Sequence, residues 1–255
     1  MLSRYVELAI LVVYTHTRTA KHPFAKGLYR TLRIPGPLVR DVTLKGMPLL
    51  ANEMLWAAAM AILNQAYSMR GLDVVAAINI ASAVYNLFSV AFLSLGNASA
   101  IIVGQALGSN DIETAKDYSG KLMAFSAAVS LLIGLTLLAF SHSIPLLYNT
   151  TDAVHSLATR LIRVDACFMW ANAVVNCSYF ILRSGGKTGV TFLFDCVFVW
   201  VLNIPLAFAL THFTAMSIIL VFACVKLTEL VKCAIGIALV RKGIWIHNIV
   251  SSPGV

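Results

Sequence analysis

The sequence predicts an all-α fold, a polytopic bundle of transmembrane helices, from its composition and from two patterns along the chain. Hydrophobic residues make up 59% of the chain and charged residues only 12%, and the mean hydropathy is +0.83. A soluble protein is about half apolar and about one quarter charged, so these polar residues are too few to cover a surface in water. The apolar residues gather into long runs, and most Lys and Arg residues lie between the runs. Lipid is therefore the expected solvent for much of the chain.

The N-terminal part is expected to contain the end of one helix and a linker. Residues 1–15 are apolar but short, and they lack the small-residue cleavage pattern of a signal peptide, so we interpret them as the end of a truncated transmembrane helix. Residues 16–45 form a basic connector that Pro35-Gly36-Pro37 interrupts. The basic residues of this connector are Arg18, Lys21, Lys26, Arg30, Arg33, Arg40 and Lys45.

A lobe of six transmembrane helices is expected over residues 46–242, followed by a cytoplasmic tail at 243–255. A helix that rises 1.5 Å per residue needs about 20 residues to cross about 30 Å of hydrocarbon. The segments that meet this length are 46–69, 74–104, 119–141, 153–182, 188–211 and 214–240. The second is longer than a perpendicular span, which predicts tilt, a bend near Gly96 or extension beyond the lipid.

Two helix starts carry capping signals. Asn110 with Glu113 three residues later resembles a capping box, and Thr151-Asp152 can cap the fourth span.

The charges of the loops predict the orientation in the membrane. If the connector is cytoplasmic, the loops on its side also carry Lys116, Lys121, Arg183, Lys187, Arg241 and Lys242. The opposite loops carry only Arg70, Arg160 and Arg163. This asymmetry agrees with the positive-inside rule, so the connector and the C-terminus should face the cytoplasm.

The composition also argues against several other classes of protein. The net charge of +8 does not indicate a nucleic-acid partner, because the basic residues lie between apolar runs and form no basic stripe. The five cysteines lie inside apolar runs without metal-ligand spacing, so we expect reduced cysteines and no metal site. Arg183-Ser184-Gly185-Gly186-Lys187-Thr188 does not match the phosphate-binding loop motif, and we interpret it as a tight basic turn. No catalytic grouping is present, so we expect neither an enzyme nor a cofactor.

Glu53 is the leading candidate for a functional residue, because a carboxylate at membrane depth is costly. Steps of three or four residues along its helix place Trp56, Met60, Asn64 and Tyr67 on the same face. An acid, aromatic rings and an amide on one face can hold a lipophilic cation by charge and by the ring quadrupole. The alternative is that Glu53 is a paired structural acid beside residues that pack the bundle.

Amide side chains recur on two further spans. The fourth span carries Asp165, Asn172, Asn176 and Tyr179, and the second carries Asn79, Asn86 and Asn97 in a similar phase. These stripes suggest a shared polar interior that faces away from lipid, or else hydrogen bonds that only hold the helices together. On the last span, Glu229 has Lys226 and Lys232 one turn away on either side, which predicts a local ion pair. The predicted substrate cavity is lined by Asn52, Trp56, Asn64, Tyr67, Asn79, Asn86, Asn176 and Tyr179.

Four segments resemble, in order, the C-terminal half of bacterial multidrug and toxic compound extrusion (MATE) transporters. They are Leu44–Trp56 (LKGMPLLANEMLW), Ala76–Ile80 (AAINI), Ala100–Gly108 (AIIVGQALG) and Leu182–Thr188 (LRSGGKT). Members of this family have two six-helix lobes that open alternately and export organic cations against Na⁺ or H⁺.

The resemblance implies a role for particular residues. Glu53 matches the acid on the seventh helix that couples cations. The register of an additional aspartate on the tenth helix holds Asn172, so Asp165, two turns away, is only a possible substitute. The implied location is the bacterial plasma (inner) membrane.

The chain is much shorter than a family member, so the resemblance implies a six-helix C-lobe and the end of the preceding helix. A cavity between lobes would then need an N-lobe or a second copy as partner, besides membrane lipid and an organic cation substrate. The alternatives are a lipid-linked oligosaccharide flippase of the same superfamily, which should have a cationic interior, an inactive truncated fragment, or a membrane enzyme.

Overall fold

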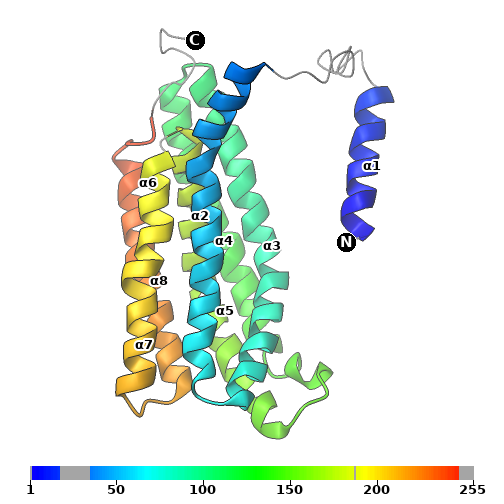
Figure 1. Ribbon diagram of the computed structural model, residues 1–255, viewed down its shortest axis with the longest axis vertical. Coiled ribbons are helices and arrows are strands. Elements are labelled where there is room, and N and C mark those ends of the chain that lie inside the picture. The colour runs from blue at the N-terminus through cyan, green and yellow to red at the C-terminus, as the bar shows by residue number, and fades with distance from the viewer. Residues whose placement is uncertain (1, 18–34, 187, 247–255) are drawn as a thin grey trace. The chain divides into compact units, whose positions relative to one another are not determined.

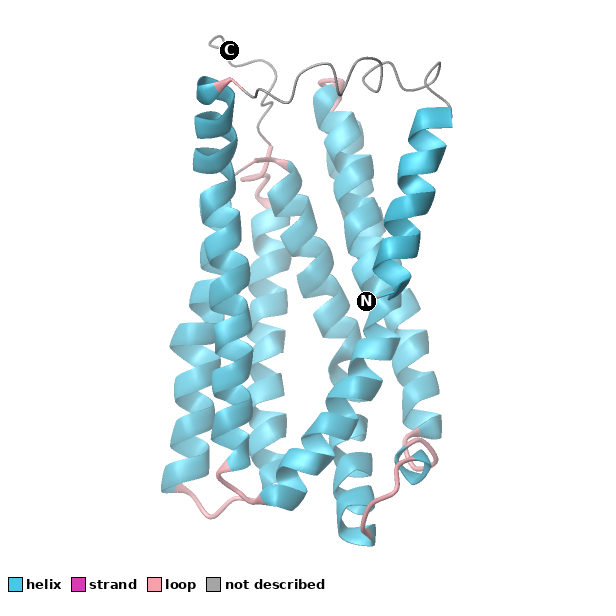
Figure 2. Cartoon of the chain, turned by 45° about the vertical axis from the view of Figure 1, so that its right-hand side comes forward, coloured by secondary structure: helices cyan, strands magenta, loops and turns pink. Residues whose placement is uncertain are grey.

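The computed structural model describes residues 2–17, 35–186 and 188–246, and its regular elements there are all helices (Figure 2). The chain divides into two units, Met1–Met47 and Pro48–Val255. The first unit contains α1 (Leu2–Thr17) and the start of α2 (Gly36–Ser68). Most of the predicted connector lies outside the described residues. Helix α2 begins within the Pro35-Gly36-Pro37 break, where a proline in the first turn removes an N–H that would have no helical partner.

Helical segments occupy all of the predicted spans in the second unit and run along a common direction (Figure 1). After α2 come α3 (Leu72–Gly108), α4 (Ile112–Phe140), α5 (Asp152–Ser184) and α8 (Ile218–Arg241). Between α5 and α8 lie the consecutive segments α6 (Thr188–Phe192), η3 (Leu193–Val197), η4 (Val199–Asn203) and α7 (Ile204–Phe213). A short 3₁₀ turn, η2 (Pro145–Leu147), lies between α4 and α5.

Three helical stretches among the described residues are long and apolar enough to cross a membrane: Leu72–Gly108, Ile112–Phe140 and Gly189–Phe213. The polar residues of the candidate site lie on the other long helices, α2, α5 and α8, and also on these apolar stretches, which carry Asn79, Asn86 and Asp195. Polar residues in transmembrane helices usually face a bundle interior or a cavity, because lipid offers them no partner.

Helix α5 is the centre of the bundle and packs against α3, α4 and α8. One hydrophobic cluster joins α5 to α2, α3, α7 and α8 around Leu161, Met169 and Val221. A second cluster joins α5 to α3, α4 and α8 around Val103, Ile181 and Trp245. Because α5 belongs to both clusters, packing on several sides fixes the position of its polar residues.

Small residues allow the helices to approach closely. A side chain at Gly134 would place its Cβ 2.7 Å from the carbonyl oxygen of Ala166, so α4 can lie this close to α5 only with glycine there. At Gly96 a side chain would collide with Asn176 and Phe180 of α5. The helix α3 continues through Gly96, so the glycine serves close packing within a continuous helix.

The capping predictions had different outcomes. Thr151 caps α5 as predicted, since its hydroxyl accepts a hydrogen bond from the Val154 amide at 3.4 Å. The predicted Asn110 cap was wrong by one residue. Asp111 caps α4 by accepting from the Thr114 amide at 3.1 Å. Asn110 instead adopts a left-handed conformation with φ of 62°, which asparagine tolerates better than most residues. The hydrogen bond from Thr114 lowers the pKa of Asp111, which keeps this cap ionised.

The fifth predicted span contains two π-helical turns, η3 and η4, which its composition does not reveal. Pro205 follows them directly in the first turn of α7. Proline has no N–H to donate to a carbonyl of the preceding turn, and its ring would collide with that carbonyl in a regular α-helix. The wider π-helical turns before Pro205 make room for the ring. Such π-helical turns are common at functional sites, and η3 carries Asp195.

Candidate functional site

The structure places Glu53 and its neighbour Asn52 in different surroundings. Glu53 lies on an exposed part of α2, whereas Asn52 is buried. The Asn52 amide donates a hydrogen bond of 3.5 Å to Asp195 Oδ2 in η3. Three residues after Asn52 along α2, the backbone carbonyl of Leu55 accepts a hydrogen bond of 3.1 Å from the indole of Trp200 in η4. These bonds hold the first membrane turns of α2 against the π-helical turns.

The predicted stripe on α2 is half-buried at Met60 and otherwise exposed except at its end. Trp56 and Asn64 are exposed, and Tyr67 is buried against Phe222 of α8 with ring centroids 5.7 Å apart. On α3, both Asn79 and Asn86 are exposed as well. Asn64, Asn79 and Asn86 therefore do not meet in a buried interior within the described residues; they lie on surface that this chain leaves uncovered.

The amides of α5 are more enclosed. Asn172 is half-buried, and its side chain donates to the Phe168 carbonyl one turn earlier at 3.2 Å. Asn176 is half-buried against Gly96, and its Oδ1 atom is buried without a hydrogen-bond partner among the described residues. Tyr179 is buried beside Phe180. Of these side chains, only Asn176 has an unused buried acceptor.

Asp165 is buried in α5 and forms an ion pair with Lys226 of α8, with 2.8 Å between Oδ1 and Nζ. Only 5% of the Asp165 side chain is exposed, compared with 21% of the Lys226 side chain. The Lys226 ammonium also lies 4.9 Å from the ring centroid of Tyr85 in α3 and 5.3 Å from that of Phe222. We call Asp165, Lys226, Tyr85 and Phe222 the α5–α8 site. It combines a carboxylate with aromatic faces, the groups that bind ammonium ions.

A second ion pair joins Asp195 of η3 to Lys232 of α8, also at 2.8 Å. Here the lysine is the enclosed partner, with 5% of its side chain exposed, compared with 19% for the Asp195 side chain. The rings of Phe194 and Phe198 lie 5.4 and 5.8 Å from the Lys232 ammonium. We call Asp195, Lys232, Phe194, Phe198 and Asn52 the η3–α8 site.

The predicted local ion pair of Glu229 was wrong. Lys226 and Lys232 form their ion pairs with acids on other elements. The buried carboxylate of Asp165 needs a partner more than the half-buried carboxylate of Glu229 does, and the tertiary fold brings Asp195 to Lys232. The sequence contained one signal for these ion pairs. Lysines at membrane depth on residues 214–240 need acidic partners, and such partners can lie on other helices of the bundle.

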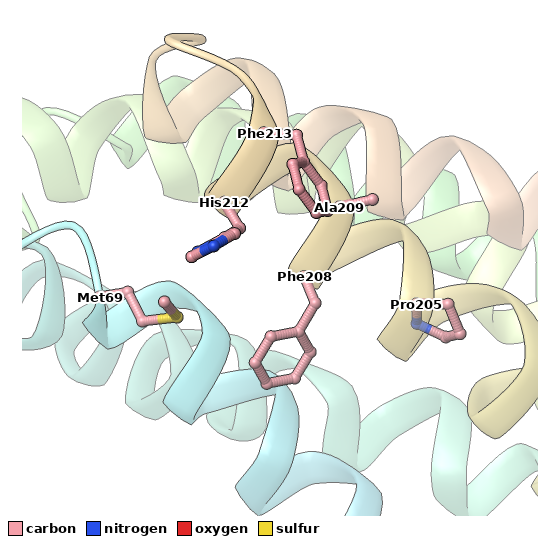
Figure 3. Close-up of a pocket in the computed structure, with 6 residues that line it drawn as sticks. All are labelled: Met69, Pro205, Phe208, Ala209, His212 and Phe213. Atoms are coloured by element: carbon pink, nitrogen blue, oxygen red, sulfur yellow. The ribbon is translucent and has the colours of Figure 1, made fainter.

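A cavity of about 490 Å³ lies between the end of α2 and α7. Its lining residues are Met69, Pro205, Phe208, Ala209, His212 and Phe213, and Figure 3 shows the His212 ring projecting into the space between Met69 and Phe213. None of the residues predicted for the substrate cavity lines it. The polar residues of the candidate site therefore lie away from this apolar cavity.

Metal chemistry has no support in the described part of the chain. No group of three or more His, Cys, Asp or Glu side chains there is arranged to hold a metal ion, and the five cysteines are free. The half-buried Lys226 and the buried Lys232 are each neutralised by an acid. These described residues therefore do not form the cationic interior that a flippase of lipid-linked oligosaccharides should have.

A model of the MatE family matches residues 48–209, which cover all but the last of the long helices. This chain belongs to the MATE family of transporters. It is similar to the probable multidrug resistance protein YoeA of Bacillus subtilis, at 23% identity over 82% of this chain and 46% of that protein. It is also similar to the multidrug resistance protein NorM of Aliivibrio fischeri, at 28% identity over 74% of this chain and 38% of NorM.

Solved structures of MATE transporters share the fold. An outward-facing multidrug resistance MATE transporter matches with a TM-score of 0.74 at 17% identity, over 84% of this chain and 49% of the other. A transporter of the same superfamily from Pyrococcus furiosus, described as having a binding pocket of reverse polarity, matches with a TM-score of 0.75. The chain spans about half the length of the relatives that it matches. It is a multi-pass membrane protein of this transporter family.

Proposed function

We propose that this chain is the C-lobe of an antiporter that exports organic cations across a bacterial inner membrane and takes up Na⁺ or H⁺ in exchange. Membership of the MATE family supports a role in transport. The observation that carries the cation specificity is the exposed Glu53 on α2, on a helix that contributes to a membrane lobe. An acid cannot face lipid at low cost, so an exposed acid at membrane depth is best explained by an aqueous cavity.

We propose that a second lobe completes this cavity, either a separate N-lobe or a second copy of this chain. The exposed residues Trp56, Asn64, Asn79 and Asn86 support this arrangement, because an aromatic ring and amides suit a cavity wall better than a lipid-facing surface. The loop charges support a cytoplasmic position for the connector and the C-terminus.

In this proposal Glu53 is the acid that binds the coupling ion or the organic cation in turn. Loss or gain of one charge at a desolvated acid changes the relative free energy of two conformations, which is the basis of coupling. Asp165 serves as a second acid within the lobe.

The test is efflux of ethidium from a bacterial strain that lacks its own drug exporters, with this chain expressed alone and together with the N-lobe of a full-length relative. Glu53→Gln should reduce the efflux rate at least tenfold. Glu113→Gln is the matched control, because Glu113 is also an exposed glutamate but lies in the first turn of α4. Efflux that is absent in every combination, or that Glu53→Gln leaves unchanged, would contradict the proposal.

A further inference from the structure

A second cavity, of about 530 Å³, lies between α4, α5 and α8, and we call it the α4–α8 groove. Its lining includes Lys116, Gly120, Met123, Trp170, Ile237 and Arg241. Met123 is buried, whereas Gly120 and Trp170 are exposed, so the groove is open on the outer surface of the bundle. A molecule outside the bundle can therefore enter it from the side.

Gly120 contributes to the space in this groove. A Cβ atom at Gly120 would meet no atom within 4 Å, whereas a Cβ atom at Gly96 or Gly134 would collide with α5. Close approach of helices therefore explains the other two glycines but not Gly120. The side chain that is missing at Gly120 leaves room for a ligand instead.

The groove has the length and the polarity of one leaflet of a bilayer. Along α4 it extends from Lys116 to Ala127, a length of about 16 Å at 1.5 Å per residue. The hydrocarbon core is about 30 Å thick, so one leaflet is about 15 Å deep. Lys116 lies near the start of α4 and Arg241 at the end of α8, and the rest of the lining is apolar apart from Ser119. This arrangement suits a chain with a charged head.

The two basic residues leave uncompensated positive charge at one end of the groove. Neither Lys116 nor Arg241 forms an ion pair with an acid in the described part of the chain. Asp117, the neighbour of Lys116, pairs with Lys121 at 2.6 Å and does not line the groove. Arginine binds phosphate through two parallel hydrogen bonds and lysine binds it as a point charge. Basic pockets between transmembrane helices bind anionic lipid headgroups in this way.

We propose that the α4–α8 groove is a binding site for an anionic phospholipid. Lys116 and Arg241 hold its phosphate, and one acyl chain lies along Met123 and Ile237. A free phosphate would gain nothing from the apolar part of the groove, and a lipid without net charge would gain little from the basic pair. Both parts of the ligand are therefore needed.

The first experiment measures lipid bound to the unmodified chain in detergent by native mass spectrometry. Dioleoylphosphatidylglycerol is anionic, dioleoylphosphatidylcholine has the same chains without net charge, and glycerol phosphate has a phosphate without chains. The anionic lipid should bind about tenfold more tightly than the zwitterionic lipid, and glycerol phosphate should not displace it. Equal binding of the two lipids, or displacement by glycerol phosphate at equal concentration, would overturn the proposal.

Charge variants locate the phosphate. Lys116→Gln and Arg241→Gln should each weaken binding of phosphatidylglycerol about fivefold. Lys242→Gln is the matched control, because Lys242 is the exposed neighbour of Arg241 and does not line the groove. Equal losses in Arg241→Gln and Lys242→Gln would show general attraction between charges and would contradict the assignment.

A filling variant locates the acyl chain. Gly120→Leu should reduce binding of phosphatidylglycerol at least fivefold with no change of charge, because the added side chain occupies space in which a Cβ atom meets no protein atom within 4 Å. Ala128→Leu is the control, since Ala128 is exposed on the same helix outside the groove. Unchanged binding in Gly120→Leu would refute the position of the chain.

Fluorescence tests the same position in a bilayer. Trp170 lines the groove, and the difference in signal between the unmodified chain and Trp170→Phe gives its fluorescence. In phosphatidylcholine vesicles, a small fraction of phosphatidylglycerol with brominated chains should quench this signal severalfold more than the same fraction of brominated phosphatidylcholine. Equal quenching would refute the site. These measurements involve no transport, so they test the lipid site separately from the proposed efflux.

Discussion

The α5–α8 site and the η3–α8 site have the same ion pair and opposite accessibility. Both join a lysine of α8 to an acid at 2.8 Å, and both place aromatic rings beside the ammonium. In the first site the acid is enclosed and the lysine is accessible, and in the second the lysine is enclosed and the acid is accessible. The comparison teaches that distance alone does not describe a buried ion pair, because two pairs of equal length differ in which partner is enclosed.

The largest expected effect separates the two lysines. Lys226→Met leaves the enclosed carboxylate of Asp165 without a partner and should lower the free energy of unfolding by about 3–5 kcal/mol. Lys232→Met should cost less, because Asp195 is more accessible and keeps its hydrogen bond from Asn52. Thermal and denaturant unfolding of the purified variants in detergent would measure this order. The reverse order would show that accessibility does not distinguish the two sites.

Double variants sharpen the comparison by removing both charges of one site. Asp165→Asn/Lys226→Met should recover about 2 kcal/mol or more of the loss caused by Lys226→Met, since no buried charge then lacks a partner. Asp195→Asn/Lys232→Met should recover less than this. A double-mutant cycle at each site measures the coupling energy. Additive losses at the α5–α8 site would contradict the assignment of Lys226 as the partner of Asp165.

The aromatic contact of the first site should have a smaller effect. Tyr85→Leu removes the ring closest to Lys226 and should lower the free energy of unfolding by about 2 kcal/mol through loss of the cation–π contact and of ring packing. Tyr85→Phe keeps the ring and is the control. If the two variants lose the same stability, the hydroxyl rather than the ring is responsible.

The smallest expected effect concerns the bond between α2 and the second site. Asn52→Ala removes a long hydrogen bond of 3.5 Å to Asp195 and should cost about 1 kcal/mol. The stability loss caused by Lys226→Met should be the same with and without Asn52→Ala, because Asn52 does not belong to the α5–α8 site. A loss that differs between the two backgrounds would show that the two sites are coupled.

The fold could be predicted because its signals are local. Apolar runs of transmembrane length located every long helix of the second unit, and the Thr151 hydroxyl located the start of α5. The Asn110 cap was missed because two adjacent residues can both cap a helix, and the backbone conformation selects one of them. The π-helical turns before Pro205 were missed because a proline predicts a disturbed helix without specifying the form of the disturbance.

The candidate site could be predicted only in part. Helical spacing grouped Glu53 with Trp56 and Asn64, and all three are exposed. Spacing could not show that the neighbouring Asn52 turns inward, since residues one step apart on a helix differ by about 100° and packing decides which of them is buried. The partner of Lys226 was missed for a related reason: the chain order places Glu229 nearest, but the acid that most needs a counter-ion lies on α5.

The sequence by itself determined that this protein is helical, resides in a membrane and has polar residues on particular helices, because composition and the period of the apolar pattern are properties of the chain alone. The tertiary structure alone decided which charges pair and which partner of each pair remains accessible. The physical reason is that the cost of a buried charge depends on its surroundings, and residues far apart in the chain supply them. Asp165 and Lys226 meet only because α5 and α8 pack together.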